Sequence, residues 1–128
     1  MKSLLDVSIV SPEGTLFEGM AINVVLPGKK SPFAVFESHA GIVSELVPGV
    51  LTVWQEQKTN KYVIESGFVE VKENRVIALV DYAIEIADID AEDEQELLTN
   101  LIEGKTDLST EDRLKKIELT RVKLRSVA

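Results

Sequence analysis

The sequence contains no cysteine and only one histidine, His39, and these two shortages exclude several kinds of catalytic and metal site. Without cysteine there is no disulfide, no thiolate metal ligand and no thiol nucleophile. One histidine cannot build a three-histidine zinc site or a two-histidine iron site within a single chain. A serine hydrolase would depend on His39 alone, and the Gly-x-Ser-x-Gly motif of many such enzymes is absent. The residues therefore do not support an enzyme of these classes.

Long apolar runs and positive net charge are also missing. No stretch of about 20 apolar residues is present, which excludes a membrane-spanning helix. Residues 1–6 reach an aspartate too soon for a signal peptide and lack the Arg/Ser-rich character of a transit peptide, so we expect the protein to act where it is made. The formal net charge is −8, which repels nucleic-acid phosphates, and we expect no nucleic-acid partner.

What is present divides the 128 residues into two unlike parts. Residues 1–87 contain all four prolines and six of the seven glycines, and short runs of Val, Ile and Leu recur there between turn residues. This pattern is typical of a β-sandwich or barrel. We expect a tight reversal at Glu73-Asn74 and strands at residues 5–9, 15–18, 22–26, 33–36, 42–46, 50–57, 62–65, 67–71 and 75–80.

The pattern after residue 87 is helical. Apolar residues recur at helical spacings at Leu97, Leu98, Leu101 and Ile102, and a second stripe with such spacings runs through Leu114, Ile117, Thr120 or Arg121, and Leu124. Such stripes predict two one-sided helices. We expect Asp90 to cap the first helix, Gly104 to end it, and Ser109 or Thr110 to cap the second. The two helices should pack as an antiparallel hairpin.

The charges of the two expected helices have opposite signs. Residues 88–107 carry 8 acidic side chains and 1 basic one, whereas residues 108–128 carry 3 acidic and 6 basic ones. Opposite charges attract across the hairpin, although each exposed pair contributes only about 0–1 kcal/mol. Because the apolar stripes are thin, we expect the hairpin to be weakly held and able to open or dock elsewhere.

Several stretches, taken in order, resemble the epsilon subunit of F-type ATP synthases. They are Val10–Gly14 with Phe17–Gly19, Val24–Gly28, Phe33–Ala40, Leu46–Leu51, Ser66–Val71, Ala78–Ala83 and Ile89-Asp90. One such stretch alone occurs in many β proteins, but their order and spacing across residues 10–90 are specific. The helical tail is similar to the family in size and placement rather than in distinctive residues.

The resemblance implies a mainly β fold with a C-terminal α part. Residues 1–87 would form an antiparallel β-sandwich of about ten strands that binds the gamma subunit and the c-ring, and residues 88–128 a regulatory two-helix hairpin. It also implies a non-catalytic central-stalk (rotor) subunit of a proton- or sodium-translocating ATP synthase, without a cofactor of its own.

In this family the hairpin folds against the sandwich or extends along gamma, and in many bacteria the extended form inhibits ATP hydrolysis. The resemblance therefore implies transient contacts with the alpha and beta subunits. It implies a peripheral location on the cytoplasmic face of the bacterial plasma membrane, with the plastid thylakoid as the less favoured location.

The candidate site residues follow from these expectations. On the sandwich, the candidate contacts to the gamma subunit or the c-ring are Phe33, Glu37, Ser38, His39 and Trp54. On the hairpin, the candidate contacts to the beta or gamma subunit are Arg113, Lys115, Lys116, Arg121, Lys123 and Arg125. Plainer interpretations remain open: His39 bonded to local backbone, Trp54 covering the hairpin, and the basic residues forming a solvated face paired with the acidic helix. We expect most of the apolar residues around Phe33 to lie in the core.

Two stretches depart from the family pattern. Pro32 stands where the family commonly has an acid, in the loop that meets the c-ring. Some members bind ATP through an Ile/Leu-Asp-x-x-Arg-Ala motif at the start of the first helix. This chain has Ile89–Glu94 there, and Asp93 takes the arginine position. Because an acid repels phosphate, we expect little or no ATP binding.

Two other classes of protein remain open on the residues alone. One is a stand-alone β-sandwich binding module whose helical tail mediates dimerisation. The other is a small jelly-roll enzyme, which the single histidine and the lack of cysteine argue against. Asp81 and Glu85 are better explained as surface acids than as a catalytic pair, because no sugar site, metal site or base accompanies them.

Overall fold

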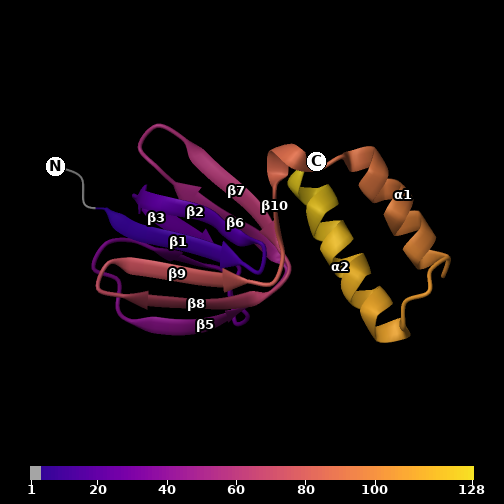
Figure 1. The fold of residues 1–128 in the computed structure, drawn as a ribbon, viewed down its shortest axis with the longest axis horizontal. Helices are drawn as coiled ribbons and strands as arrows, with labels where there is room; N and C mark the ends of the chain where they lie inside the picture. Colours follow the sequence, from indigo (N-terminus) through magenta and orange to yellow (C-terminus); the bar gives the residue numbers. More distant parts are fainter. Residues whose placement is uncertain (1–3) are drawn as a thin grey trace.

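The computed structural model describes residues 4–128; Met1, Lys2 and Ser3, on which part of the signal-peptide expectation depends, lie outside the described residues. The described residues form ten β-strands in two five-stranded sheets, followed by one 3-10 turn and two α-helices. Figure 1 shows the sheets stacked as a sandwich at one end of the molecule and the helices as an antiparallel pair at the other. The expected fold class, a β-sandwich followed by a helical hairpin, is confirmed.

The first sheet has the strand order β2-β1-β9-β8-β5. Its strands are β1 (Leu5–Ser11), β2 (Gly14–Ala21), β5 (Ile42–Leu46), β8 (Gly67–Lys72) and β9 (Arg75–Val80). Neighbours are antiparallel, except that β1 and β9 are parallel. Glu73 and Asn74 join β8 to β9 with φ values of 51° and 62°. Two positive φ values are what a tight two-residue hairpin requires, so the expected reversal is confirmed.

The second sheet has the strand order β10-β7-β6-β3-β4, and its neighbours are antiparallel. Its strands are β3 (Asn23–Leu26), β4 (Phe33–Val35), β6 (Gly49–Trp54), β7 (Thr59–Ile64) and β10 (Ala83–Glu85). All the strands expected from the residue pattern are present, with ends that differ by a few residues. β10 is the additional strand that the pattern did not indicate.

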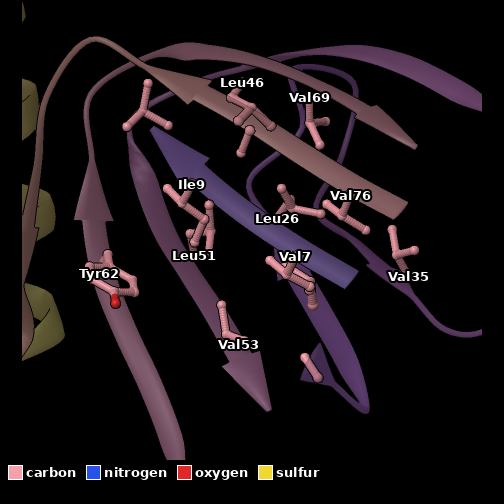
Figure 2. Close-up of a cluster of buried hydrophobic side chains, with 14 of the residues drawn as sticks. Val7, Ile9, Leu26, Val35, Leu46, Leu51, Val53, Tyr62, Val69 and Val76 are labelled. Atoms are coloured by element: carbon pink, nitrogen blue, oxygen red, sulfur yellow. The ribbon is translucent and has the colours of Figure 1, made fainter. Parts of the chain in front are cut away.

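The core lies between the two sheets and is built from alternate residues of their strands. In β8 every second residue, starting from Gly67, is buried and those between are exposed, because strand side chains alternate between the two faces. One continuous cluster of buried apolar residues draws at least one side chain from each of β1 to β9. Figure 2 shows part of it in close-up, with Ile9 and Val76 from the first sheet and Leu26 and Leu51 from the second. Each fully buried Val, Leu or Ile contributes roughly 1.5–3 kcal/mol.

Two Pro-Gly pairs meet at one corner of the sandwich. Pro27-Gly28 follows β3 of the second sheet, and Pro48-Gly49 lies between β5 of the first sheet and β6 of the second, which begins at Gly49. The Val47 backbone N–H donates to the Pro27 carbonyl oxygen at 3.0 Å, and Gly28 forms a β-bridge with Leu46. A Cβ added at Gly49 would lie 2.6 Å from the Pro27 Cβ. The two chain segments approach too closely for a side chain, which explains the glycine physically.

The helical part begins with the 3-10 turn η1 (Ile86–Asp88) and continues with α1 (Ala91–Ile102) and α2 (Thr110–Ser126). Asp90 caps α1 by accepting hydrogen bonds from two backbone N–H groups of its first turn. Ser109, rather than Thr110, caps α2. Gly104 follows the end of α1 with a φ of 76°, a left-handed conformation that glycine adopts most easily. The expected capping residues are confirmed.

The apolar stripe expected on α2 is wrong in part. Leu114 is 57% exposed, whereas Leu119 and Val122 are buried. Figure 1 shows the reason: α2 lies between α1 and the sandwich, so its buried surface is divided between two neighbours and does not follow a single stripe. On α1, Ile102 is also exposed.

Candidate functional site

The segment from β4 to β5 contains four of the candidate contacts. Phe33 is half-buried and packs against the core, whereas Glu37 and Ser38 are exposed. The Ser38 backbone N–H donates to Oδ1 of Asn74 at 2.7 Å, which ties the loop to the β8–β9 turn. The His39 Nδ1 donates to the carbonyl oxygen of the next residue at 2.7 Å, so this ring is bonded to local backbone. In Figure 1 the β8–β9 turn lies at the end of the sandwich away from the helices.

Trp54 ends β6 and is 43% exposed on the outer face of the second sheet. Val50, four residues earlier in the same strand, belongs to the apolar cluster that packs against α2. Four residues of strand span roughly 13 Å. Trp54 therefore lies away from the part of β6 that packs against α2, and the interpretation in which it covers the hairpin stays a prediction. Its role as a partner contact also stays a prediction.

The outer face of the first sheet carries apolar residues that the sequence interpretation missed. Phe68 in β8 and Leu79 in β9 are 57% and 56% exposed and lie directly opposite each other. Leu79 also lies opposite Val10 of β1. Val43 in β5 is 72% exposed, and Ile77 in β9 is partly exposed on the same side. We call the surface formed by these five residues the open face.

Charged residues surround the open face. Glu45 lies opposite Phe68, and Glu70 lies opposite both Val43 and Ile77. In Figure 1 no helix crosses β9, β8 or β5. An exposed apolar patch with a polar rim is typical of a protein-binding surface. A signal for it was present in the sequence, because Phe68 occupies a solvent-facing position in a cleanly alternating strand.

The basic residues of α2 do not form one continuous face. Arg113 donates from Nη1 to the Leu101 carbonyl oxygen at 3.1 Å and so joins the two helices. Lys115 pairs with Glu111 of the same helix at 3.5 Å. Three residues are exposed and can meet an acidic partner without rearrangement of the helix, namely Lys116, Arg121 and Arg125.

Lys123 differs from the other basic candidates because its side chain is only 11% exposed. Its Nζ lies 3.0 Å from Oε1 of Glu94 in α1, and 4.7 Å from the centroid of the Tyr82 ring. Burial alone would lower the pKa of Lys123. Hydrogen bonds and charge interactions with Tyr82 and Glu94 outweigh burial and raise the pKa above its ordinary value of 10.5. Lys123 is thus a charged lysine paired inside the molecule.

A cavity of about 310 Å³ lies where the helix pair meets the sandwich. Its walls include the carboxylates of Glu65 and Asp112 as well as Lys116 and Lys123. Because acidic side chains lie beside the lysines, a phosphate group in this cavity would not have uniformly positive surroundings. Asp93, at the position of the family's arginine, lies exposed in the first turn of α1. The expectation of little or no ATP binding stays a prediction.

Within residues 4–128, no three or more His, Asp or Glu side chains are grouped so that they could hold a metal ion. None of the helices described here is both long and apolar enough to cross a bilayer.

Comparison with known families defines the class of the sandwich. Residues 4–86 match the family described as "ATP synthase, Delta/Epsilon chain, beta-sandwich domain". This range takes in all ten strands, from β1 to β10. The fold and the match together identify residues 4–86 as the β-sandwich domain of ATP synthase delta and epsilon chains.

Relatives narrow the assignment to the epsilon chain. The ATP synthase epsilon chain of Leptospira borgpetersenii is 37% identical over 97 residues, which cover 76% of each chain. That of Maricaulis maris is 39% identical over 92 residues, covering 72% of this chain and 69% of the relative. That of Campylobacter fetus is 38% identical over 103 residues, covering 80% and 78%. The chain belongs to the ATP synthase epsilon chain family, which confirms the resemblance drawn from its motifs.

Two solved structures share the fold. A chain in the cryo-EM structure of the Euglena gracilis mitochondrial ATP synthase (OSCP, F1 and c-ring) superposes with a TM-score of 0.85 at 18% identity, covering 98% of this chain and 82% of that chain. A chain in the central stalk and c-ring structure of the Tetrahymena thermophila mitochondrial ATP synthase gives a TM-score of 0.71 at 14% identity, covering 99% and 98%. The coverage extends over both the sandwich and the helix pair.

Proposed function

We propose that this chain is a non-catalytic central-stalk (rotor) subunit of a proton- or sodium-translocating F-type ATP synthase, in which it couples the gamma subunit to the c-ring. It has no catalytic residues of its own. Membership of the epsilon chain family supports this function, as does the likeness to a chain from a central stalk and c-ring assembly. The open face is the structural observation on which the proposal mainly rests.

The open face has the properties of a surface for a permanent protein partner. Phe68 and Leu79 expose more than half of their side chains side by side on a rigid sheet. Aromatic residues are enriched at the centres of protein interfaces, and a charged rim commonly surrounds them. Because α2 packs on the second sheet, the open face is accessible while the helices are docked. We assign the gamma subunit to this face.

The two ends of the sandwich suit two further partners. The loop with Phe36, which is 54% exposed, and the neighbouring Glu37, Ser38 and His39 lies at the end opposite the helix pair. A subunit between the membrane ring and the catalytic head needs one contact surface at each end. We assign the loop to the c-ring and the helix pair to transient contacts with the alpha and beta subunits. This places the chain peripherally at the cytoplasmic face of the bacterial plasma membrane.

Regulation is assigned to residues 88–128, as distinct from the coupling sandwich of residues 1–87. In the extended state the exposed cations of α2 would dock on an acidic surface of the beta subunit and inhibit ATP hydrolysis. This inhibition is tested in reconstituted enzyme by reversing the charges of Lys116, Arg121 and Arg125 to Glu. We expect ATP hydrolysis to rise. The same reversal at Lys30, Lys58 and Lys61 of the sandwich is the control, and unchanged latency in the helix variant refutes the assignment.

Affinity capture from membranes of the source organism tests the complex as a whole. We expect the alpha, beta and gamma subunits to be recovered with the chain. Recovery of the chain alone, together with a self-dimer on gel filtration, contradicts the rotor function and favours a stand-alone binding module.

Calorimetry with purified gamma tests the assignment of the open face. Changing Phe68 and Leu79 together to Ser should weaken binding by about tenfold or more, because central apolar contacts dominate interface energies. Leu114→Ser is the matched control, since Leu114 is as exposed as Phe68 but lies on the helix pair. An equal loss of affinity in both variants means that gamma is not held by the open face. Thermal melting verifies that each variant is folded.

Calorimetry with ATP tests the nucleotide expectation separately. Because Asp93 replaces an arginine, we expect only millimolar or weaker affinity. Micromolar binding contradicts it.

A further inference from the structure

One ammonium group connects the three parts of the chain that meet beside the sandwich. Lys123 lies on α2, Glu94 lies on α1, and Tyr82 lies on the segment between β9 and β10. The Lys123 Nζ is 3.0 Å from the Glu94 carboxylate and 4.7 Å from the centroid of the Tyr82 ring. A cation at this distance from an aromatic face is attracted to it. This single side chain therefore joins both helices to each other and to the sandwich.

The Lys123–Glu94 pair is shielded from water, unlike four other ion pairs of the described residues. Its side chains are 11% and 14% exposed. Four other pairs have both side chains at least 45% exposed, namely Lys29–Glu45, Arg75–Asp6, Lys105–Glu103 and Lys115–Glu111. Exposed pairs contribute little because water screens them. Removing one member of a shielded pair leaves the other charge unpaired, which is strongly unfavourable.

The apolar contact between α2 and the sandwich is small compared with the core between the two sheets. Leu119 and Val122 of α2 and Val63 of β7 are the buried members of this cluster, and five partly buried residues pack against them, namely Val50, Tyr82, Ile84, Ile86 and Ile89. The cavity of about 310 Å³ lies beside them, with Leu119 and Lys123 in its walls. Because hydrophobic stabilisation scales with the apolar area removed from water, this cluster stabilises the docked helix far less than the core between the sheets stabilises the sandwich. The charge contact of Lys123 accordingly has a large share in docking.

We propose that Lys123 is a latch that holds the helix pair on the sandwich, and that release of its ammonium from Glu94 and Tyr82 is the step that frees the helices. In the docked state the charge is paired internally. In the released state it joins the exposed cations of α2 and is free to meet an acidic surface. The same charge thus favours docking in the free chain and favours release when an acidic partner is offered, as a two-state element requires. This regulatory consequence rests on the proposed function, whereas the latch is a property of the free chain.

Hydrogen–deuterium exchange of the full free chain at neutral pH tests the latch. Lys123→Met keeps a long side chain but leaves the Glu94 carboxylate without its partner. We expect amides of α2 to exchange at least about tenfold faster than in the wild type, because local opening of the docked helices becomes easier. Amides of β8 and β9 should be unchanged. If the α2 amides of this variant exchange at the wild-type rate, the proposal is overturned.

Lys115→Met is the matched control for this experiment. It makes the same change on the same helix, at a side chain that is 64% exposed. We expect exchange within about twofold of the wild type, because exposed pairs contribute little. Equal acceleration in both variants means that lost helix stability, rather than the latch, is responsible, and the proposal then fails. Far-UV circular dichroism verifies that both variants keep their helix content.

Swapping the two charged residues distinguishes an ion pair from simple packing. Glu94→Lys combined with Lys123→Glu rebuilds the pair with opposite polarity, although the Tyr82 ring then no longer faces the original cation. We expect the protection of α2 to return in part relative to Lys123→Glu alone. Protection that does not return overturns the proposal.

Binding of gamma separates the latch from the proposed function. The wild-type chain should bind gamma through the open face. Failure of the wild-type chain to bind gamma, together with accelerated α2 exchange in the variant, contradicts the proposed function alone. Normal gamma binding with unaltered α2 exchange contradicts the latch alone.

Discussion

The β-sandwich and the helix pair of this chain are held in place by different balances of forces. Each of β1 to β9 contributes to one continuous apolar core. The helix pair meets the sandwich through Leu119 and Val122 and through the shielded charge of Lys123. The sandwich should therefore lose its structure only in global unfolding, whereas the helices can be released locally.

The exposed surfaces of the two regions also differ in character. The sandwich exposes apolar side chains at the open face, with Phe68 and Leu79 at its centre. The helix pair exposes mainly charged side chains. Apolar contacts on a rigid sheet suit a lasting partner, whereas exposed charges give contacts that are screened and readily exchanged. The functions proposed for the two regions, permanent coupling for the sandwich and reversible regulation for the helix pair, agree with this difference.

The largest difference is expected for a core truncation in the sandwich. Leu51 is fully buried, and Leu51→Ala should lower the free energy of unfolding by roughly 2–5 kcal/mol through lost burial and a cavity. Leu114→Ala on the exposed side of α2 should change it by less than about 0.5 kcal/mol. Urea denaturation measures both. Equal effects would contradict the assignment of the stability to the sandwich core.

Two glycine substitutions should lower stability by intermediate amounts, one in each region. A Cβ at Gly67 would collide with the carbonyl oxygen of Leu79 in the neighbouring strand, so Gly67→Ala should lower global stability by roughly 2–3 kcal/mol. Gly104→Ala places a side chain at a φ of 76° after α1 and should cost about 1 kcal/mol. That loss should appear only in the exchange of helix amides. A shift of the whole denaturation curve by Gly104→Ala would show that the two regions unfold together.

Removal of a helix cap is expected to have a smaller and strictly local effect. Asp90 accepts hydrogen bonds from the backbone N–H groups of Glu92 and Asp93 at 3.0 and 3.2 Å. Asp90→Ala should destabilise α1 by about 1 kcal/mol. Hydrogen exchange should detect this in α1, with the melting of the sandwich unaltered. Lower protection in β8 would contradict the independence of the two regions.

The last expected effect is confined to high pH. The pKa of Lys123 is raised in the folded chain above 10.5, so its contribution to docking is fully present below about pH 10.5 and is lost as pH rises through the folded-state pKa. Because the chain lacks cysteine, spin labels can be attached at cysteines introduced at Ile102 and Thr59. Their separation should begin to increase only above about pH 10.5. In Lys123→Met the same pH dependence should be absent, and an identical profile in both proteins contradicts this origin.

Much of the fold could be predicted because local residue patterns determine it. The alternation in β8, the Glu73-Asn74 reversal and the caps at Asp90 and Ser109 all depend on neighbours in sequence. The buried face of α2 could not be predicted, since it depends on α1 and the sandwich at once. The pairing of Lys123 with Glu94 also depends on how two helices pack.

The candidate contacts were less predictable than the fold. A sequence pattern distinguishes the solvent-facing from the core-facing residues of a strand, but it does not show which outer face a helix will cover. Phe68 and Leu79 become a common surface only because β8 and β9 are paired in register. Lys116 and Lys123 are similar as lysines of one helix, yet one is exposed and the other is shielded.

Gel filtration of the full chain with an equimolar amount of purified gamma subunit tests the rotor assignment most directly. We expect both proteins to elute together as a one-to-one complex, at a volume smaller than that of either protein alone. Separate elution of the two proteins, with the chain forming a dimer of itself, would contradict it.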